Sequence, residues 1–142
     1  MLFRYSALTF NGHRIHYDQQ YAHDVEGYKN LVVHGPLTAT LLQDFAQDCL
    51  PDSRLAKFEF KGVSPLFCNE TLELQAQMDE DDPDRLNMRV LNQSGVLAMT
   101  AIAHLDADTT HKAMYSRPRS TKGGRRLGTI QRMEQGNEPD LP

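Results

Sequence analysis

Cysteine is scarce in this sequence, and long apolar runs are absent from it. Two of the 142 residues are cysteines, Cys49 and Cys68, and they form neither a CxxC motif nor the Cys/His spacing of a zinc site. We therefore expect two free thiols in a reducing compartment. No apolar stretch approaches the roughly 20 residues of a membrane-spanning helix, and no charged start followed by an apolar segment indicates a secretory leader. These absences favour a cytoplasmic protein.

An overall positive charge is also lacking. The formal net charge is −4 and the isoelectric point is 5.8, so the composition does not favour nucleic-acid binding. Six Lys and Arg residues do gather in one stretch, Lys112–Arg126, which contains no Asp or Glu. Aromatic residues do not alternate with these charges as they do in proteins that bind single-stranded nucleic acid. A solvated segment is the simpler interpretation of this stretch.

Apolar residues are slightly few, at 39% of the chain, and part of the shortfall lies near the C-terminal end. Residues 107–142 have almost no apolar periodicity and many Arg, Lys, Gly, Pro and Ser residues. We interpret them as a basic, mobile tail. Residues 1–106 are then expected to form one domain, which is long enough to bury a core of its own.

The clearest periodic pattern predicts one long helix that begins at Pro36 and ends before Pro51. Proline suits the first position of a helix, because the N–H that it lacks would have no helical partner there. Apolar residues then recur at intervals of three and four, namely at Leu37, Leu41, Leu42, Phe45, Ala46 and Cys49. We expect this helix to be largely buried.

Several other segments alternate between apolar and polar residues, as half-buried strands do. After the helix they are residues 55–62, 71–78, 86–91 and 96–105. A turn that ends at Gly95 joins the last two, and the acidic stretch 79–84 is expected to be a solvated turn rather than a metal site. Residues 2–10 are interpreted as one further strand. Its apolar residues are Phe3, Tyr5, Leu8 and Phe10.

The segment between the first predicted strand and the helix, residues 13–33, shows no clean period. We expect short helical turns and loop there, with Asp18 as the N-cap of one turn. One long helix packed on an antiparallel sheet of about five strands is an α+β arrangement. A sheet that wraps around a single helix in this way is a hotdog fold.

Two short motifs contain the candidate functional residues. The first follows Asn11-Gly12, a turn signal because both residue types tolerate positive φ. Within four residues it brings together His13, Arg14 and His16. A connecting loop rarely needs two imidazoles and a guanidinium, so we interpret this motif as part of a site. The second motif is Val33–Thr38, Val-His-Gly-Pro-Leu-Thr, where the long helix is predicted to begin.

Together, Phe10–Tyr17 (Phe-Asn-Gly-His-Arg-Ile-His-Tyr) and Val33–Thr38 resemble the MaoC-like hydratase/dehydratase family. The similarity is closest to its branch of hydroxyacyl-thioester dehydratases type 2 and mesaconyl- and itaconyl-CoA hydratases, and it covers residues 2–106. The resemblance implies a hotdog enzyme that adds water to, or removes it from, the double bond of an acyl thioester on coenzyme A or acyl carrier protein. It also implies a second hotdog, from another copy or a separate subunit, and no metal or redox cofactor.

By the same resemblance, the family's catalytic Asp falls on Asn11, its catalytic His on His16, and the glycine whose N–H binds the thioester carbonyl on Gly35. An imidazole titrates near neutral pH, so His16 suits a general base. Asn11 cannot ionise but can hold water or substrate through hydrogen bonds. The helix start offers unpaired N–H groups, those of Gly35 and Leu37, to the thioester oxygen. One base serving both proton transfers would give syn addition.

Other polar residues near the motifs have open roles. His34 either orients its loop or contacts substrate, and His13 is a further candidate for a substrate contact. Arg14 could bind a substrate carboxylate or a coenzyme A phosphate, or it is an ordinary surface arginine. The basic stretch Lys112–Arg126 could likewise attract a coenzyme A phosphate or an acidic carrier protein.

Two other functions compete with hydration. A hotdog thioesterase needs a carboxylate or an equivalent group to activate water, and Asp44 and Asp48 of the predicted helix are candidates. A non-catalytic subunit that binds thioesters or lends its sheet to an active hydratase is the second alternative. The presence of both Asn11 and His16 argues against that second alternative.

Overall fold

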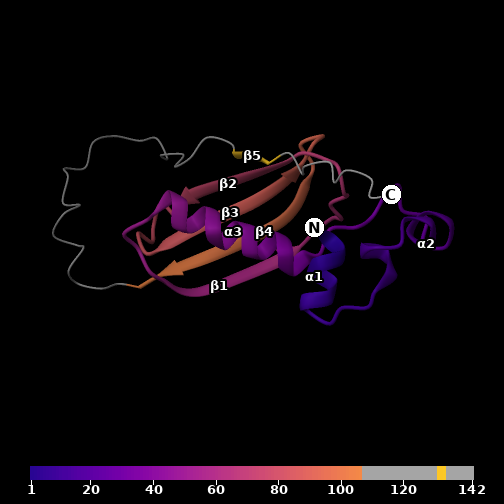
Figure 1. Cartoon of the computed structure of the whole chain (residues 1–142). Helices are drawn as coiled ribbons and strands as arrows, with labels where there is room; N and C mark the ends of the chain where they lie inside the picture. Colours follow the sequence, from indigo (N-terminus) through magenta and orange to yellow (C-terminus); the bar gives the residue numbers. More distant parts are fainter. Residues whose placement is uncertain (107–130, 134–142) are drawn as a thin grey trace.

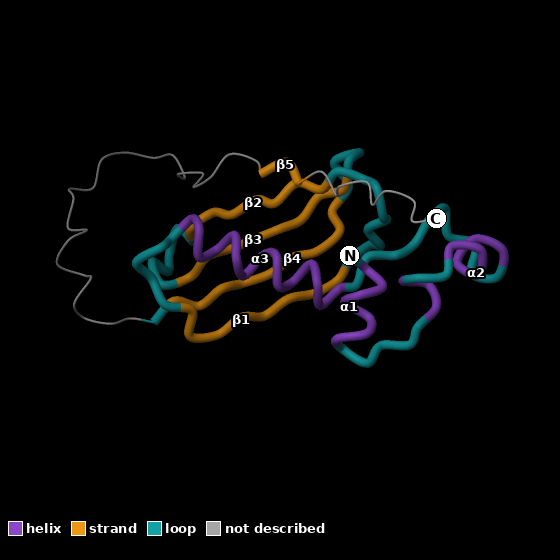
Figure 2. The backbone as a smooth tube through the Cα atoms, viewed as in Figure 1, coloured by secondary structure: helices purple, strands orange, loops and turns teal. Residues whose placement is uncertain are grey.

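The computed structural model describes residues 1–106 and 131–133. The elements are α1 (Leu2–Leu8), η1 (Arg14–His16), α2 (Gln19–Asp24), α3 (Gly35–Cys49), β1 (Leu55–Gly62), β2 (Leu72–Met78), β3 (Arg85–Asn92), β4 (Leu97–Leu105) and β5 (Gln131–Met133). Within these residues the strands form one antiparallel sheet of five, in the order β1-β4-β3-β2-β5. The long helix α3 lies along one face of this sheet, while α1 and α2 lie beyond one end (Figures 1 and 2). The predicted α+β class is confirmed.

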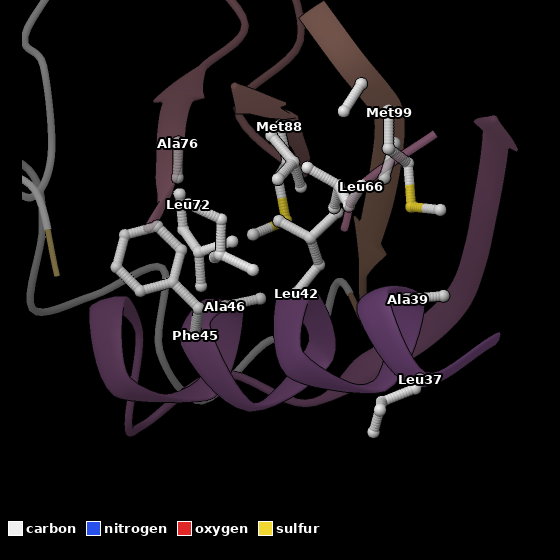
Figure 3. Close-up of a cluster of buried hydrophobic side chains, with 14 of the residues drawn as sticks. Leu37, Ala39, Leu42, Phe45, Ala46, Leu66, Leu72, Ala76, Met88 and Met99 are labelled. Atoms are coloured by element: carbon white, nitrogen blue, oxygen red, sulfur yellow. The ribbon is translucent and has the colours of Figure 1, made fainter. Parts of the chain in front are cut away.

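Helix α3 is the helix that the sequence predicts, beginning one residue earlier than Pro36. Its buried residues follow the predicted periodicity and are Leu37, Thr38, Ala39, Leu42, Phe45 and Ala46. Leu42 is fully buried, and together with Ala46 it points from the helix toward the sheet (Figure 3). The buried residues of this helix face belong to the main hydrophobic core together with those of the sheet. Complete burial of one leucine side chain stabilises the fold by about 1.5–3 kcal/mol.

The four predicted strands that follow α3 are all present. In β2, β3 and β4, burial alternates along the strand, because successive side chains point to opposite faces of the sheet. The buried residues are those on the face that α3 covers. Gly95 has a φ of +76°, as the turn between β3 and β4 requires. Strand β1 is confirmed, but it is less buried than the alternating pattern suggests. It is an edge strand paired with β4, and Phe60 remains 48% exposed.

The prediction of a strand over residues 2–10 is wrong, because most of this segment is the helix α1. Its inward residues are Leu2 and, one helical turn later, the adjacent Tyr5 and Ser6. Three of the apolar residues behind the strand prediction, Phe3, Leu8 and Phe10, are 68%, 79% and 96% exposed. The positive φ of the following turn falls on Phe10, at +54°, and not on Asn11 or Gly12.

The sheet has the expected number of about five strands, but its fifth strand is β5 and not residues 2–10. Strand β5 pairs with Leu72–Leu74 of β2 at one edge of the sheet. The mobile tail interpreted over residues 107–142 lies outside the described residues, apart from Gln131–Met133. Asp18 caps α2 as predicted, since its side chain accepts a hydrogen bond from the N–H of Tyr21 at 2.9 Å. None of the helices in the described ranges is long and apolar enough to cross a membrane.

Candidate active site

The two sequence motifs meet where η1 contacts the start of α3. The imidazole rings of His16 and His34 are stacked, with their centroids 3.7 Å apart and their planes 19° from parallel. The N–H of Val32 donates to the carbonyl oxygen of Ile15 at 2.9 Å, which ties the two segments together. Because His34 immediately precedes Gly35, this contact brings His16 to the N-terminus of α3. The structure therefore brings His16 and His34, one residue from each motif, into direct contact.

His16 is buried and held in one tautomer. Its Nδ1 lies 2.7 Å from the carbonyl oxygen of Val32, and it is 8% exposed. A carbonyl oxygen can only accept a hydrogen bond, so Nδ1 carries the proton of the neutral ring. The lone pair is then on Nε2, which is the atom available as a base.

His34 is buried more deeply, at 1% exposure. Its Nε2 lies 2.8 Å from the hydroxyl oxygen of Ser6, while its Nδ1 is buried with no hydrogen-bond partner among the described residues. Burial, reinforced by the neighbouring charge of protonated His16, lowers the pKa of His34 to about 4. His34 is therefore neutral near pH 7, and its ring can stack on His16 without charge repulsion.

The N-terminus of α3 offers backbone donors beside these rings. The N–H of Thr38 is the first with an intrahelical acceptor, the carbonyl oxygen of His34 at 3.1 Å. The N–H groups of Gly35 and Leu37 precede it and have no intrahelical carbonyl to reach. A Cβ atom added to Gly35 would meet nothing within 4 Å, so there is open space beside this backbone. An anionic oxygen placed there would meet free N–H groups and the positive end of the helix dipole.

Asn11 lies in the turn that leads into η1. Its side-chain oxygen accepts a hydrogen bond from the N–H of His13 at 3.0 Å, and the residue is partly buried. This bond leaves the amide NH₂ group available for donation to water or substrate. The ring of His13 is exposed and stands edge-on to that of His16, with 5.7 Å between centroids.

Arg14 contacts α2 and the residue that caps it. Its guanidinium pairs with the carboxylate of Asp18 at 2.7 Å and lies 4.1 Å from the ring centroid of Tyr21. The hydrogen bonds to Asp18 raise the pKa of Arg14, and the bonds from Tyr21 and Arg14 lower the pKa of Asp18. Arg14 thus has structural partners, and its contact with a substrate carboxylate stays a prediction.

Two residues of α1 belong to this site although the sequence analysis missed them. Ser6 contacts Nε2 of His34, and the ring of Tyr5 packs edge-on against the same imidazole, with 4.8 Å between centroids. The signal that could have found them is the helical spacing of Leu2, Tyr5 and Ser6. The exposed aromatic residues of the same segment concealed that spacing.

The two carboxylates considered for a thioesterase lie elsewhere. Asp44 and Asp48 are exposed on the C-terminal half of α3. At 1.5 Å per residue they are roughly 14 and 20 Å along the axis from Gly35. A hollow of about 670 Å³ lies on the sheet face opposite α3, lined by residues such as Lys61, Gln75 and Arg89, and it includes no predicted site residue.

This chain is similar to known proteins in both its sequence and its fold. The sequence profile described as hydroxyacyl-thioester dehydratase type 2 matches residues 1–68. The chain is 43% identical over 106 residues to mesaconyl-C(4)-CoA hydratase of Chloroflexus aurantiacus, and the match covers 74% of this chain and 36% of that protein. It is 42% identical over 76 residues to the mitochondrial hydroxyacyl-thioester dehydratase type 2 of Schizosaccharomyces pombe, covering 52% of this chain and 25% of that protein.

Among solved structures, the chain is similar to an (R)-hydratase from A. caviae, with a TM-score of 0.61 and 25% sequence identity. That match covers 74% of this chain and 83% of the hydratase. The predicted hotdog fold is thereby confirmed. In the sequence comparisons, this chain spans 36% of the length of the Chloroflexus aurantiacus protein and 25% of the length of the Schizosaccharomyces pombe protein.

Proposed function

Because the chain belongs to the MaoC-like hydratase/dehydratase family, in its branch of hydroxyacyl-thioester dehydratases type 2, we propose that it adds water to, or removes it from, the double bond of an acyl thioester. The observation that carries this proposal is the contact of His16 with His34, which brings an imidazole base to the free N–H groups at the start of α3. A base and an oxyanion-binding helix end are the two groups that this reaction needs.

The hydration step can be written with these groups. Nε2 of His16 takes a proton from water, and the oxygen of that water forms a bond to C3 of the unsaturated thioester. The electron pair of the double bond moves toward the carbonyl, whose oxygen accepts hydrogen bonds from the N–H groups of Gly35 and Leu37. His16 then returns its proton to C2 on the same face, and dehydration is the reverse. The amide of Asn11 holds the water or the substrate hydroxyl.

We further propose that the complete site needs a second hotdog, either another copy of this chain or a separate subunit. Exposed apolar side chains support this, since Phe10 directly precedes Asn11, and Phe3 and Leu8 are exposed on the preceding helix α1. Large exposed apolar groups next to a site are typical of protein interfaces. The substrate is proposed to be a thioester of coenzyme A or acyl carrier protein, and the name of the Chloroflexus relative makes mesaconyl-CoA a first candidate.

No metal or redox cofactor enters this mechanism, because acid–base chemistry and oxyanion binding balance every step. A hotdog thioesterase is less well supported, since Asp44 and Asp48 lie far along α3 from Gly35. A cytoplasmic location stays a prediction, and the S. pombe relative is described as mitochondrial.

The test is to offer crotonyl-CoA, mesaconyl-CoA and itaconyl-CoA separately to the purified full-length chain. Hydration removes the absorbance of the conjugated thioester without releasing free coenzyme A. Release of the thiol would indicate a thioesterase, and binding without either change would indicate a non-catalytic subunit. Either of these results would overturn the proposal.

A further inference from the structure

The hydroxyl group of Ser6 is a buried polar group that the proposed mechanism does not use. Ser6 is 5% exposed and lies on the inward face of α1. Its oxygen is 2.8 Å from Nε2 of His34, and the described residues offer it no second hydrogen-bond partner. The next residue back, Tyr5, packs edge-on against the same imidazole. Helix α1 thus contacts the ring of His34 through two adjacent side chains.

The direction of the bond between Ser6 and His34 follows from a count of unpaired groups. If Nε2 of His34 carried the proton and donated it to Ser6, the hydroxyl proton of Ser6 and the lone pair of Nδ1 would both be buried without partners. If the hydroxyl donates to Nε2, one group remains unpaired, the N–H at Nδ1. Each buried unpaired polar group costs about 1–3 kcal/mol, so the second arrangement is favoured.

His16 needs support from this ring because it has one hydrogen bond among the described residues. The bond from Nδ1 to the carbonyl of Val32 sets its tautomer, but this one hydrogen bond alone restrains rotation of the ring about its Cβ–Cγ bond. Nε2 lies off that axis, so such a turn would move the lone pair away from the reacting water. The stacked ring of His34, 3.7 Å away, blocks the turn as long as His34 itself is fixed.

We propose that Ser6 is a positioning residue: its hydroxyl donates to Nε2 of His34, fixes the tautomer and plane of that ring, and thereby holds His16 in its productive orientation. The effect on turnover rests on the proposed hydratase function, whereas the tautomer does not. Ser6 itself touches no reacting atom. It acts through His34, and His34 acts through its stacking contact with His16.

The first test reads the tautomer of His34 in the full-length protein without substrate, by long-range ¹H–¹⁵N correlation spectra of the histidine rings. We expect the proton on Nδ1 in the wild-type chain and a mixture of both tautomers in Ser6→Ala. A proton on Nε2 of wild-type His34 would overturn the proposal. This measurement does not depend on whether the chain hydrates any thioester.

The second test compares the kinetics of Ser6→Ala, Ser6→Thr and Thr9→Ala. Ser6→Ala is expected to lower kcat about tenfold with KM within twofold, in line with the loss of groups that orient a catalytic histidine. Ser6→Thr keeps the hydroxyl and should restore most of kcat. Thr9→Ala is the matched control, since the hydroxyl of Thr9 is on the same segment but bonds the carbonyl of Tyr5.

Two kinetic results would count against the positioning role of Ser6. One is an unchanged kcat in Ser6→Ala, and the other is an equal loss of kcat in Thr9→Ala. Circular dichroism and thermal unfolding of all three variants separate a loss of fold from a loss of orientation. If the wild-type chain hydrates no thioester while His34 carries its proton on Nδ1, the proposed function fails and the positioning contact stands.

Discussion

Nδ1 of His16 donates a hydrogen bond of 2.7 Å to the carbonyl oxygen of Val32. Together with the bond from the N–H of Val32 to Ile15, it joins η1 to the residues just before α3, and it leaves the lone pair of the ring on Nε2. Val32 also forms an isolated antiparallel bridge with Phe67.

Removal of the imidazole at position 16 should abolish turnover without loss of the fold. His16→Ala is expected to lower kcat about 1,000-fold, because a positioned general base contributes roughly 100- to 10,000-fold. His16→Gln should lose activity to a similar degree while its side-chain amide still donates to Val32. Steady-state hydration assays, with circular dichroism to verify folding, check both variants. Retention of most of kcat in either variant would rule out His16 as the base.

Gly35→Ala should separate binding of the thioester oxygen from stability. A methyl group at Gly35 meets nothing within 4 Å in this chain, and alanine favours helix more than glycine does. Thermal unfolding should therefore be unchanged or slightly later. Activity should fall about 100-fold, because the methyl group occupies the space in which the thioester oxygen approaches the N–H groups. Undiminished kcat/KM would place the oxyanion elsewhere.

The buried His34 should make folding stability depend on pH between about 4 and 6.5. The pKa of His34 is lowered to about 4 in the folded chain, while an unfolded histidine titrates near 6.5. Between these values the unfolded chain binds a proton that the folded chain excludes, so the free energy of unfolding falls as pH decreases. Over this whole range the free energy of unfolding should fall by about 3 kcal/mol, because each unit of pKa difference corresponds to about 1.36 kcal/mol.

Urea unfolding at several pH values between 7.5 and 4 measures this dependence. His34→Gln provides the control, because glutamine does not titrate but still offers an amide to Ser6. The slope between pH 6.5 and 4 should be smaller in the variant. Equal slopes in the two proteins would show that His34 is not the group responsible.

The exposed side chain of Phe10, next to Asn11, should be needed for assembly. Phe10 is 96% exposed and has a φ of +54°, an unusual backbone conformation for a bulky residue. Phe10→Ser is expected to weaken association with the second hotdog and to lower activity at dilute protein concentration. Sedimentation velocity measures the association. Val96→Ser, in a side chain of 52% exposure in the β3–β4 turn, is the control. A monomeric wild-type chain that retains full activity would contradict the need for a partner.

Local patterns were sufficient for most of the fold. Helix α3 and strands β1–β4 could be predicted because each has one dominant period, 3.6 or 2, and clear end signals such as Pro51 and Gly95. Residues 2–10 were misassigned because their most apolar side chains are on the exposed face, while the inward face includes the small polar Ser6. The spacing of apolar residues predicts which face of an element is buried only where the buried residues are apolar. In α1 the buried face includes a polar residue, so the spacing of the apolar residues was misleading.

The sequence by itself determined the long helix and the antiparallel strands after it, since periods are properties of neighbouring residues. Its motifs predicted His16 as the base and Gly35 as the glycine that binds the thioester oxygen. Only the tertiary structure decided that His16 stacks on His34, that Nδ1 of His16 donates to the carbonyl of Val32, and that Ser6 contacts His34 from α1. These contacts join residues from three separate segments. Their geometry depends on how α1, η1 and α3 pack together, and no spacing along the chain encodes it.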